Sequence, residues 1–126
     1  MKVLMLKNPL DRSDQIKKII SCVNPSCEII EITDYELMLE YTQKYKPILI
    51  VMDIGSDYLT TKLALSKFRS KYKTNIKILV ISEYIMGLIK NICVKMGATV
   101  CFDKVFDSEE IIQFFEDNLI WEFIQK

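Results

Sequence analysis

The sequence predicts an α/β fold in which five parallel strands alternate with five helices, as one doubly wound domain over residues 1–126. Apolar runs alternate with amphipathic segments, an order typical of parallel sheets with right-handed crossovers. The apolar run at residues 48–52 is unbroken, which predicts a central strand that helices cover on both faces. The run at 28–32 is more polar and the run at 99–102 is short, so both are expected at sheet edges. The strand order 2-1-3-4-5 places them there.

The boundaries of the elements follow from apolar periodicity and from turn and cap residues. The predicted strands cover residues 2–7, 28–32, 48–52, 76–81 and 99–102. The predicted helices cover approximately residues 11–23, 33–45, 57–72, 85–96 and 107–124. Thr33 and Glu36 have the spacing of a capping box at the second helix. Gly97 is expected to end the fourth helix as a C-cap, and Asp107 to be the N-cap of the last helix.

Helical periodicity also predicts which side chains face the core. In the third helix they are Leu59, Leu63 and Phe68. In the last helix they are Ile111, Ile112, Phe115, Leu119 and Phe123. Phe114 and Trp121 fall on nearly the opposite side of the last helix. This outward position predicts an apolar patch that binds a partner or a second copy of the chain, unless the chain's own tail or a neighbouring loop covers it.

Composition excludes several classes of protein. Half of the residues are hydrophobic, and glycine and proline number three each, which excludes a disordered chain. Seventeen acidic residues balance seventeen basic ones, so net charge gives no reason to expect nucleic acid or an anionic membrane. The basic stretch at residues 62–77 lacks a recognition motif for nucleic acid. No apolar stretch reaches the length of about 18 residues that a membrane helix needs, and no signal-peptide pattern is present, so we expect a cytoplasmic protein.

The cysteine and histidine content argues against metal and nucleophile chemistry. The four cysteines have no CxxC spacing, and the chain contains no histidine; the cysteines are Cys22, Cys27, Cys93 and Cys101. We therefore expect the thiols to act as small hydrophobic side chains and not as zinc ligands. The absence of histidine removes Ser–His and Cys–His pairs and the commonest general base.

Polar residues of potential function stand where the predicted strands end. Asp53 ends the third strand, Ser82 ends the fourth, and Lys104 follows the fifth. In open α/β sheets, ligands bind at this carboxyl edge. The sequence Met96-Gly-Ala98 precedes the fifth strand. In these four features, and over nearly all of its length, the chain resembles response-regulator receiver domains.

This resemblance implies a flavodoxin-like (βα)5 receiver fold and a signalling module that is not an enzyme. In receivers, the aspartate at the position of Asp53 takes a phosphoryl group from the phosphohistidine of a partner. The resemblance gives Ser82 the role of the switch residue and Lys104 that of the family's lysine. It implies a histidine kinase and an output protein or domain as partners. It also implies a magnesium ion, which receivers hold with an acidic pair at the end of the first strand.

The sequence departs from the receiver pattern at the metal pocket. Lys7 and Asn8 stand where the acidic pair should be, and Cys101 stands where the switch aromatic should be. An ammonium group cannot ligate a cation, so we expect no cofactor, with Mg²⁺ bound only if phosphorylation is retained. The expected function is an atypical receiver that acts through protein contacts, with weak or no phosphorylation of Asp53.

Two alternatives stay open. One is a functional phosphoacceptor receiver that uses Asp53. The other is a small flavodoxin-like ligand-binding domain or enzyme. The loop at Gly55-Ser56 lacks the glycine spacing of nucleotide-binding loops, which argues against the second alternative.

Overall fold

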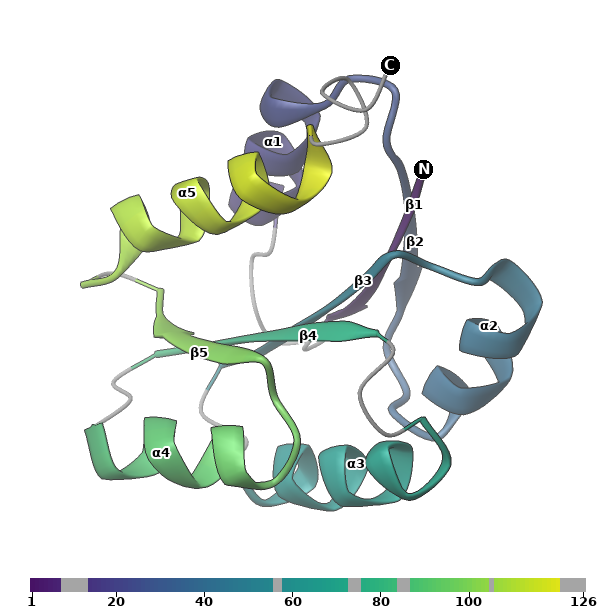
Figure 1. The fold of residues 1–126 in the computed structure, drawn as a ribbon, viewed down its shortest axis with the longest axis vertical. Helices are drawn as coiled ribbons and strands as arrows, with labels where there is room; N and C mark the ends of the chain where they lie inside the picture. Colours follow the sequence, from purple (N-terminus) through teal and green to yellow (C-terminus); the bar gives the residue numbers. More distant parts are fainter. Residues whose placement is uncertain (8–13, 56–57, 73–75, 84–86, 105, 121–126) are drawn as a thin grey trace.

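The protein is described by a computed structural model that covers residues 1–7, 14–55, 58–72, 76–83, 87–104 and 106–120. Five parallel strands form one sheet in the order β2-β1-β3-β4-β5 (Figure 1). The strands are β1 (Lys2–Lys7), β2 (Glu28–Ile32), β3 (Leu49–Gly55), β4 (Lys77–Ser82) and β5 (Val100–Asp103). The helices are α1 (Asp14–Val23), α2 (Leu37–Tyr45), α3 (Tyr58–Lys71), α4 (Gly87–Lys95) and α5 (Ser108–Leu119). The predicted α/β class, the alternation and the strand order are confirmed.

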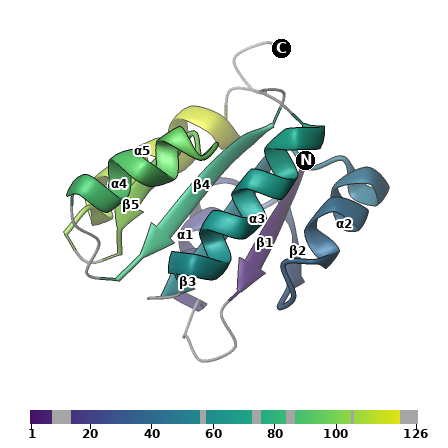
Figure 2. The same ribbon diagram turned by 90° about the horizontal axis from the view of Figure 1, so that it is seen from below.

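Helices cover both faces of the sheet. Helices α1 and α5 lie on one face, and α2, α3 and α4 lie on the other (Figure 1). Figure 2 shows α3 between α2 and α4. Successive residues of β1 point to opposite faces: Leu4 belongs to the apolar cluster beneath α2, α3 and α4, and Met5 to the cluster beneath α1 and α5. Both faces are therefore dry, which explains the unbroken apolar runs of the central strands. No helix of the described residues is long and apolar enough to span a bilayer.

The buried face of α3 differs from the prediction. Leu59 and Leu63 were expected in the core, but they are 67 % and 55 % exposed. Among the side chains of α3 from residue 59 onward, the buried ones are Thr61, Ala64, Leu65 and Phe68. Their spacing of three, four and seven residues forms a regular helical stripe. The prediction for Phe68 is confirmed. Those for Leu59 and Leu63 were wrong, because these large apolar side chains do not lie on the helical stripe that faces the sheet.

The ends of α2 also differ from the prediction. The expected capping box of Thr33 and Glu36 is not formed, because Glu36 adopts helical backbone angles and makes no side-chain cap bond. Its N–H instead donates to Asp34 Oδ1 at 2.9 Å, which makes a local turn before the helix.

On α5, the predictions for Ile111, Phe115 and Leu119 are confirmed, since all three are buried. Ile112 is 38 % exposed and was predicted wrongly. Phe123 lies outside the described residues.

Gly97 ends α4 as the sequence predicts. It has a φ of 126°, a conformation that side chains with a Cβ rarely adopt. A Cβ at this position would collide with Cγ of Arg69. The guanidinium of Arg69 reaches from α3 to three backbone carbonyls: Nε donates to Gly97 at 2.7 Å, Nη1 to Tyr72 at 3.1 Å and Nη2 to Ile76 at 2.8 Å. Arg69 therefore fastens the C-terminal end of α4 to the end of α3 and the start of β4.

Candidate functional site

The carboxyl edge of the sheet carries a buried ion pair between β3 and the segment after β5. Asp53 lies within β3, in register with Lys7 of β1 and Ile81 of β4. The pairing of β3 with β4 shifts between Asp53 and Gly55, which marks a local irregularity at this end of the strand. Asp53 Oδ2 lies 3.4 Å from Lys104 Nζ, and the two side chains are 0 % and 10 % exposed. The carboxylate is thus at the ligand-binding edge, but beneath the surface.

The backbone of β4 positions Lys104. The N–H of Lys104 donates to the carbonyl of Ser82 at 2.8 Å. This bond extends the pairing of β4 with β5, in which Ser82 is the partner of Asp103. The separation of 3.4 Å is longer than that of a charge-assisted hydrogen bond, which is about 2.7–2.9 Å. Attraction between the charges therefore contributes more to this pair than hydrogen bonding does.

Ser82 lies at the end of β4 and is buried. Its hydroxyl donates to the carbonyl of Glu83 at 3.2 Å. The structure thus brings the end of β4 beside Lys104 through the backbone bond described above.

Asp103 is a residue of this edge that the sequence interpretation missed. It is buried, and its Oδ1 accepts a hydrogen bond from the N–H of Phe106 at 2.9 Å. Its own N–H donates to Asp107 Oδ2 at 2.7 Å, and Lys90 of α4 forms an ion pair with the same carboxylate. Burial raises the pKa of Asp107, but the hydrogen bonds from Lys90 and from the Asp103 amide outweigh it and hold the pKa below its ordinary value. These bonds fix the loop that leads from β5 into α5.

No protein-family model matches the chain, and no curated protein matches its sequence. Solved structures do match. One is the signal receiver domain of a DNA-binding response regulator (merR) from Colwellia psychrerythraea 34H, with a TM-score of 0.76, 13 % identity, and coverage of 100 % of this chain and 99 % of that chain. Another is the signal receiver domain of the putative response regulator NarL from Mycobacterium tuberculosis, with a TM-score of 0.73, 19 % identity, and coverage of 92 % and 93 %.

A LuxR-family two-component response regulator from Aurantimonas sp. SI85-9A1 also matches, with a TM-score of 0.76, 16 % identity, and coverage of 92 % of this chain and 82 % of that chain. The chain has the receiver fold. The expectation of this fold, which rested on four sequence features, is confirmed.

In this receiver fold, the end of β1 supplies a cation. Lys7 is the last residue of β1 and is half-buried. As the register partner of Asp53, it belongs to the same face of the sheet. Asn8 lies outside the described residues. Lys7 of β1 and Lys104 after β5 therefore both lie at the edge of the sheet that carries Asp53.

The described residues of this edge offer few free oxygen ligands for a magnesium ion, and the expected absence of a cofactor stays a prediction. Mg²⁺ is held by oxygen ligands, usually one or two carboxylates together with water and phosphate. Asp53 is already paired with the ammonium of Lys104, and the Oδ1 of the nearby Asp103 is bonded to the Phe106 amide. Among the described residues, no group of three or more Asp, Glu, Cys or His side chains is placed to hold a metal ion.

Of the predicted switch and interface residues, the structure describes Cys101 and Phe114. Cys101 is buried in the apolar cluster beneath α2, α3 and α4, to which Cys93 also belongs. Phe114 was expected to point away from the core, but it is half-buried and packs edge to face on Phe102 and Phe115, with ring centroids 6.4 and 6.3 Å apart. Phe114 thus lies closer to the core than its helical periodicity indicated, and the interface expected at Phe114 and Trp121 stays a prediction. Trp121 lies outside the described residues.

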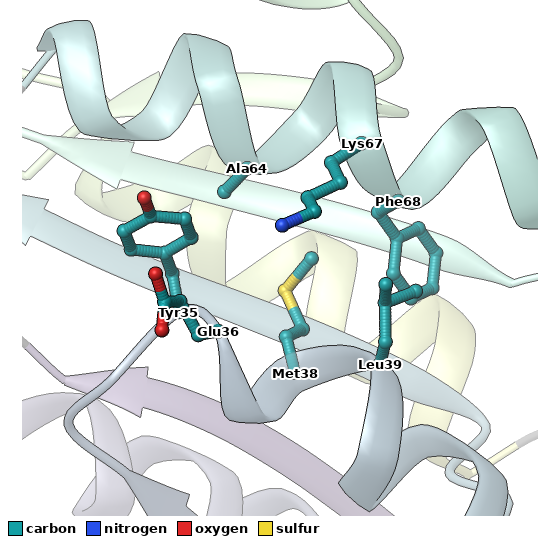
Figure 3. A pocket seen from close by; sticks show the side chains of 7 residues that line it. All are labelled: Tyr35, Glu36, Met38, Leu39, Ala64, Lys67 and Phe68. Carbon is teal, nitrogen blue, oxygen red and sulfur yellow. The ribbon is translucent and has the colours of Figure 1, made fainter.

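A small pocket between α2 and α3 offers no room for a cofactor. Its lining comprises Tyr35, Glu36, Met38, Leu39, Ala64, Lys67 and Phe68 (Figure 3). Its free volume is 20 Å³, whereas pockets for small ligands have about 300–1,000 Å³. The space is sufficient for about one water molecule. This pocket gives no support to the alternative of a flavodoxin-like enzyme.

Proposed function

We propose that the protein is a signalling receiver that acts through protein contacts, and that phosphoryl transfer to Asp53 is weak or lost. The observation that carries the proposal is the buried pair of Asp53 and Lys104, with Lys7 aligned beside Asp53 on β1. The likeness to signal receiver domains of response regulators supports the signalling role. The partners that we propose are a histidine kinase or an output protein, or a second copy of the chain. We propose no catalytic turnover.

Two physical arguments support the loss of phosphotransfer. First, a phosphoryl group needs positive charge around all of its transferring oxygens, and this charge has to be preorganised. Lys104 supplies charge on one side, but the residues at the end of β1 do not suit a metal ion. Second, the Asp53 side chain is 0 % exposed, so a phosphoryl donor has no direct access to its oxygens.

One observation favours the second candidate, a functional phosphoacceptor. Asp53 is at the carboxyl edge, with Lys104 within 3.4 Å, and this is the placement that an acceptor aspartate and its charge-stabilising lysine need. In this candidate, local rearrangement opens the pair and Lys7 replaces part of the charge of the metal ion.

The two candidates are separated by incubation with acetyl phosphate and Mg²⁺, followed by intact-mass measurement. We expect no phosphorylated species for the wild-type protein. The matched variant, Lys7→Asp combined with Asn8→Asp, provides an acidic pair and should gain a phosphoryl group. Adding Asp53→Asn to that variant should remove the gain. Stoichiometric, Mg²⁺-dependent phosphorylation of the wild-type protein at Asp53 would contradict the proposal and support the second candidate.

A further inference from the structure

The outer side of α3 combines apolar and basic side chains. Leu59 and Leu63 are exposed and lie one turn apart, on the side of α3 that points away from the sheet. Neither α3 nor α4, which lies beside it, contains an acidic residue (Figure 2). The exposed basic side chains of these two helices are Lys62, Lys67, Lys71 and Lys95. We call the two leucines and the four lysines the basic face.

The outer side of α5 has the opposite charge. This helix contains no basic residue, and it lies on the other face of the sheet (Figure 1). Its exposed acidic side chains are Glu109, Glu110, Glu116 and Asp117. Ile112 is exposed one turn before Glu116 and adds an apolar side chain to this surface. We call Ile112 and the four acidic residues the acidic face.

The two faces are complementary, but they cannot meet within one molecule. Both combine apolar side chains with charges, as protein interfaces do, and their charges are of opposite sign. The sheet and its two apolar clusters lie between α3 and α5 (Figure 1), so any attraction between the faces acts between separate molecules. Since the chain has no net charge, overall repulsion does not oppose this attraction.

We propose that the basic face of one copy of the chain binds the acidic face of a second copy. A different anionic partner, such as a nucleic acid, would use the basic face alone, whereas a second copy uses both faces. The contact joins two different surfaces, so every assembly keeps one basic face and one acidic face free at its ends. Because the two faces lie on opposite sides of the sheet, the assembly grows as an open chain and does not stop at a dimer.

A second copy of the chain is thus one partner for the proposed action through protein contacts, and the contact rests on that function. Neither face includes Asp53, Lys7 or Lys104. Phosphorylation of Asp53 and association of the two faces are therefore measured independently, and the failure of one leaves the other standing.

The contact should be weak and sensitive to salt. A single exposed ion pair contributes little to binding, so the affinity depends on several pairs together with the apolar contacts of Leu59, Leu63 and Ile112. Salt shortens the range of the attraction, because the screening length falls from about 10 Å at about 0.1 M to about 3 Å at about 1 M ionic strength.

The test is sedimentation equilibrium of the full chain over a range of protein concentrations, at about 0.1 M and about 1 M sodium chloride. At low salt, we expect the average mass of the wild-type protein to rise with concentration and to pass twice the monomer mass. At high salt, it should return to the monomer mass. A basic-face variant, Lys62→Glu with Lys67→Glu, should raise the dissociation constant about tenfold or more, because like charges then face each other. An acidic-face variant, Glu116→Lys with Asp117→Lys, should do the same.

An equimolar mixture of these two variants should associate again. In the mixture, the unchanged acidic face of one variant meets the unchanged basic face of the other, and the two reversed faces meet each other with opposite charges. Leu63→Ala should weaken the association of the otherwise native chain and leave its melting temperature unchanged. The matched control is Lys44→Glu with Lys46→Glu, two exposed lysines at the end of α2 and outside both faces. It has the same net charge as the basic-face variant and should associate like the wild type.

Several results would overturn the proposal. One is a wild-type protein that stays monomeric at low salt or that reaches a plateau at twice the monomer mass. Another is an equal loss of association in the control, which would assign the effect to net charge. A mixture of the two variants that stays monomeric, while both keep the circular dichroism spectrum of the wild type, would count against it as well. A monomeric wild-type protein that binds a DNA duplex through the same lysines would assign the basic face to nucleic acid instead.

Discussion

Replacing Lys104 tests the electrostatics of the candidate site most directly. At an effective dielectric constant of about 20, two charges 3.4 Å apart attract each other by about 5 kcal/mol. Desolvation offsets part of this attraction, but removing one member of a buried pair typically costs about 3–5 kcal/mol. We expect Lys104→Met, which keeps the apolar stem, to lower the free energy of unfolding by about 3 kcal/mol at pH 7. Solvent screening is small here, since the side chains are 10 % and 0 % exposed.

The assay is urea unfolding followed by circular dichroism on four proteins: the wild type, Lys104→Met, Asp53→Asn and the double variant. The double-mutant cycle isolates the interaction between the two side chains. We expect a coupling energy of about 2–3 kcal/mol, because the attraction exceeds the share that desolvation removes. The matched control is Lys17→Met with Glu31→Gln on the surface. Those side chains are 40 % and 33 % exposed, so their coupling should stay below about 1 kcal/mol.

A coupling energy between Lys104 and Asp53 no larger than that of the surface control would refute this reasoning. It would mean that water screens the pair or that Asp53 is not ionised in the folded protein. A repeat of the cycle at higher pH distinguishes these outcomes, because a carboxyl that is protonated at pH 7 ionises there and gains coupling to Lys104, whereas a screened pair gains none.

Three further predictions concern the fold around the site. Gly97→Ala should lower the free energy of unfolding by about 1–3 kcal/mol, because of its φ of 126° and the collision with Arg69; a urea titration measures it. Phe68→Ala should cost about 3–5 kcal/mol, since Phe68 is fully buried, whereas Leu63→Ala should change stability by no more than about 0.5 kcal/mol; equal losses would contradict the observed face of α3. Asp107→Asn should lower the melting temperature at pH 7 and not in strong acid. Folding lowers the pKa of the Asp107 carboxyl, so its ionised form stabilises the folded protein at pH values above the pKa that this group has in the unfolded chain. This stabilisation is lost as the pH falls through the pKa of the folded state. A loss of melting temperature that is the same at pH 7 and in strong acid would therefore disprove the role of the charge.

The sequence predicted the sheet better than the helices, for a physical reason. A strand buried on both faces has to be apolar at every position, so β3 and β4 are visible as uninterrupted runs. A helix buries only one stripe, and competing stripes can both be apolar. On α3, the large side chains of Leu59 and Leu63 contributed more to the hydrophobicity pattern than Ala64 did, although both leucines are exposed and Ala64 is buried. Small residues bring a helix closer to a sheet, but they contribute little to a hydrophobicity pattern.

The candidate site was predictable only in part. Asp53, Ser82 and Lys104 could be located because each marks the end of a strand, and parallel strands end at one edge. Asp103 was missed because its role comes from a hydrogen bond to the Phe106 amide, a local loop geometry that no spacing encodes. The burial of the Asp53 side chain could not be predicted either, since it depends on the elements around β3 and not on the sequence of β3 itself.

The attachment of Arg69 to Gly97 has a mechanical consequence for α4. One end of this helix is held by a charged hydrogen bond, and its other end begins near the close of β4. Any rotation of the helix as a rigid body therefore pivots about its C-terminal end. Nine residues at about 1.5 Å each make a lever of about 13 Å. A turn of 10° would shift the free end by about 2 Å, whereas Cys93, close to the pivot, would shift by less than half that amount. Because the C-terminal end of α4 is held, the largest displacement in such a rotation occurs at its N-terminal end, at the edge of the sheet where Asp53 and Ser82 lie.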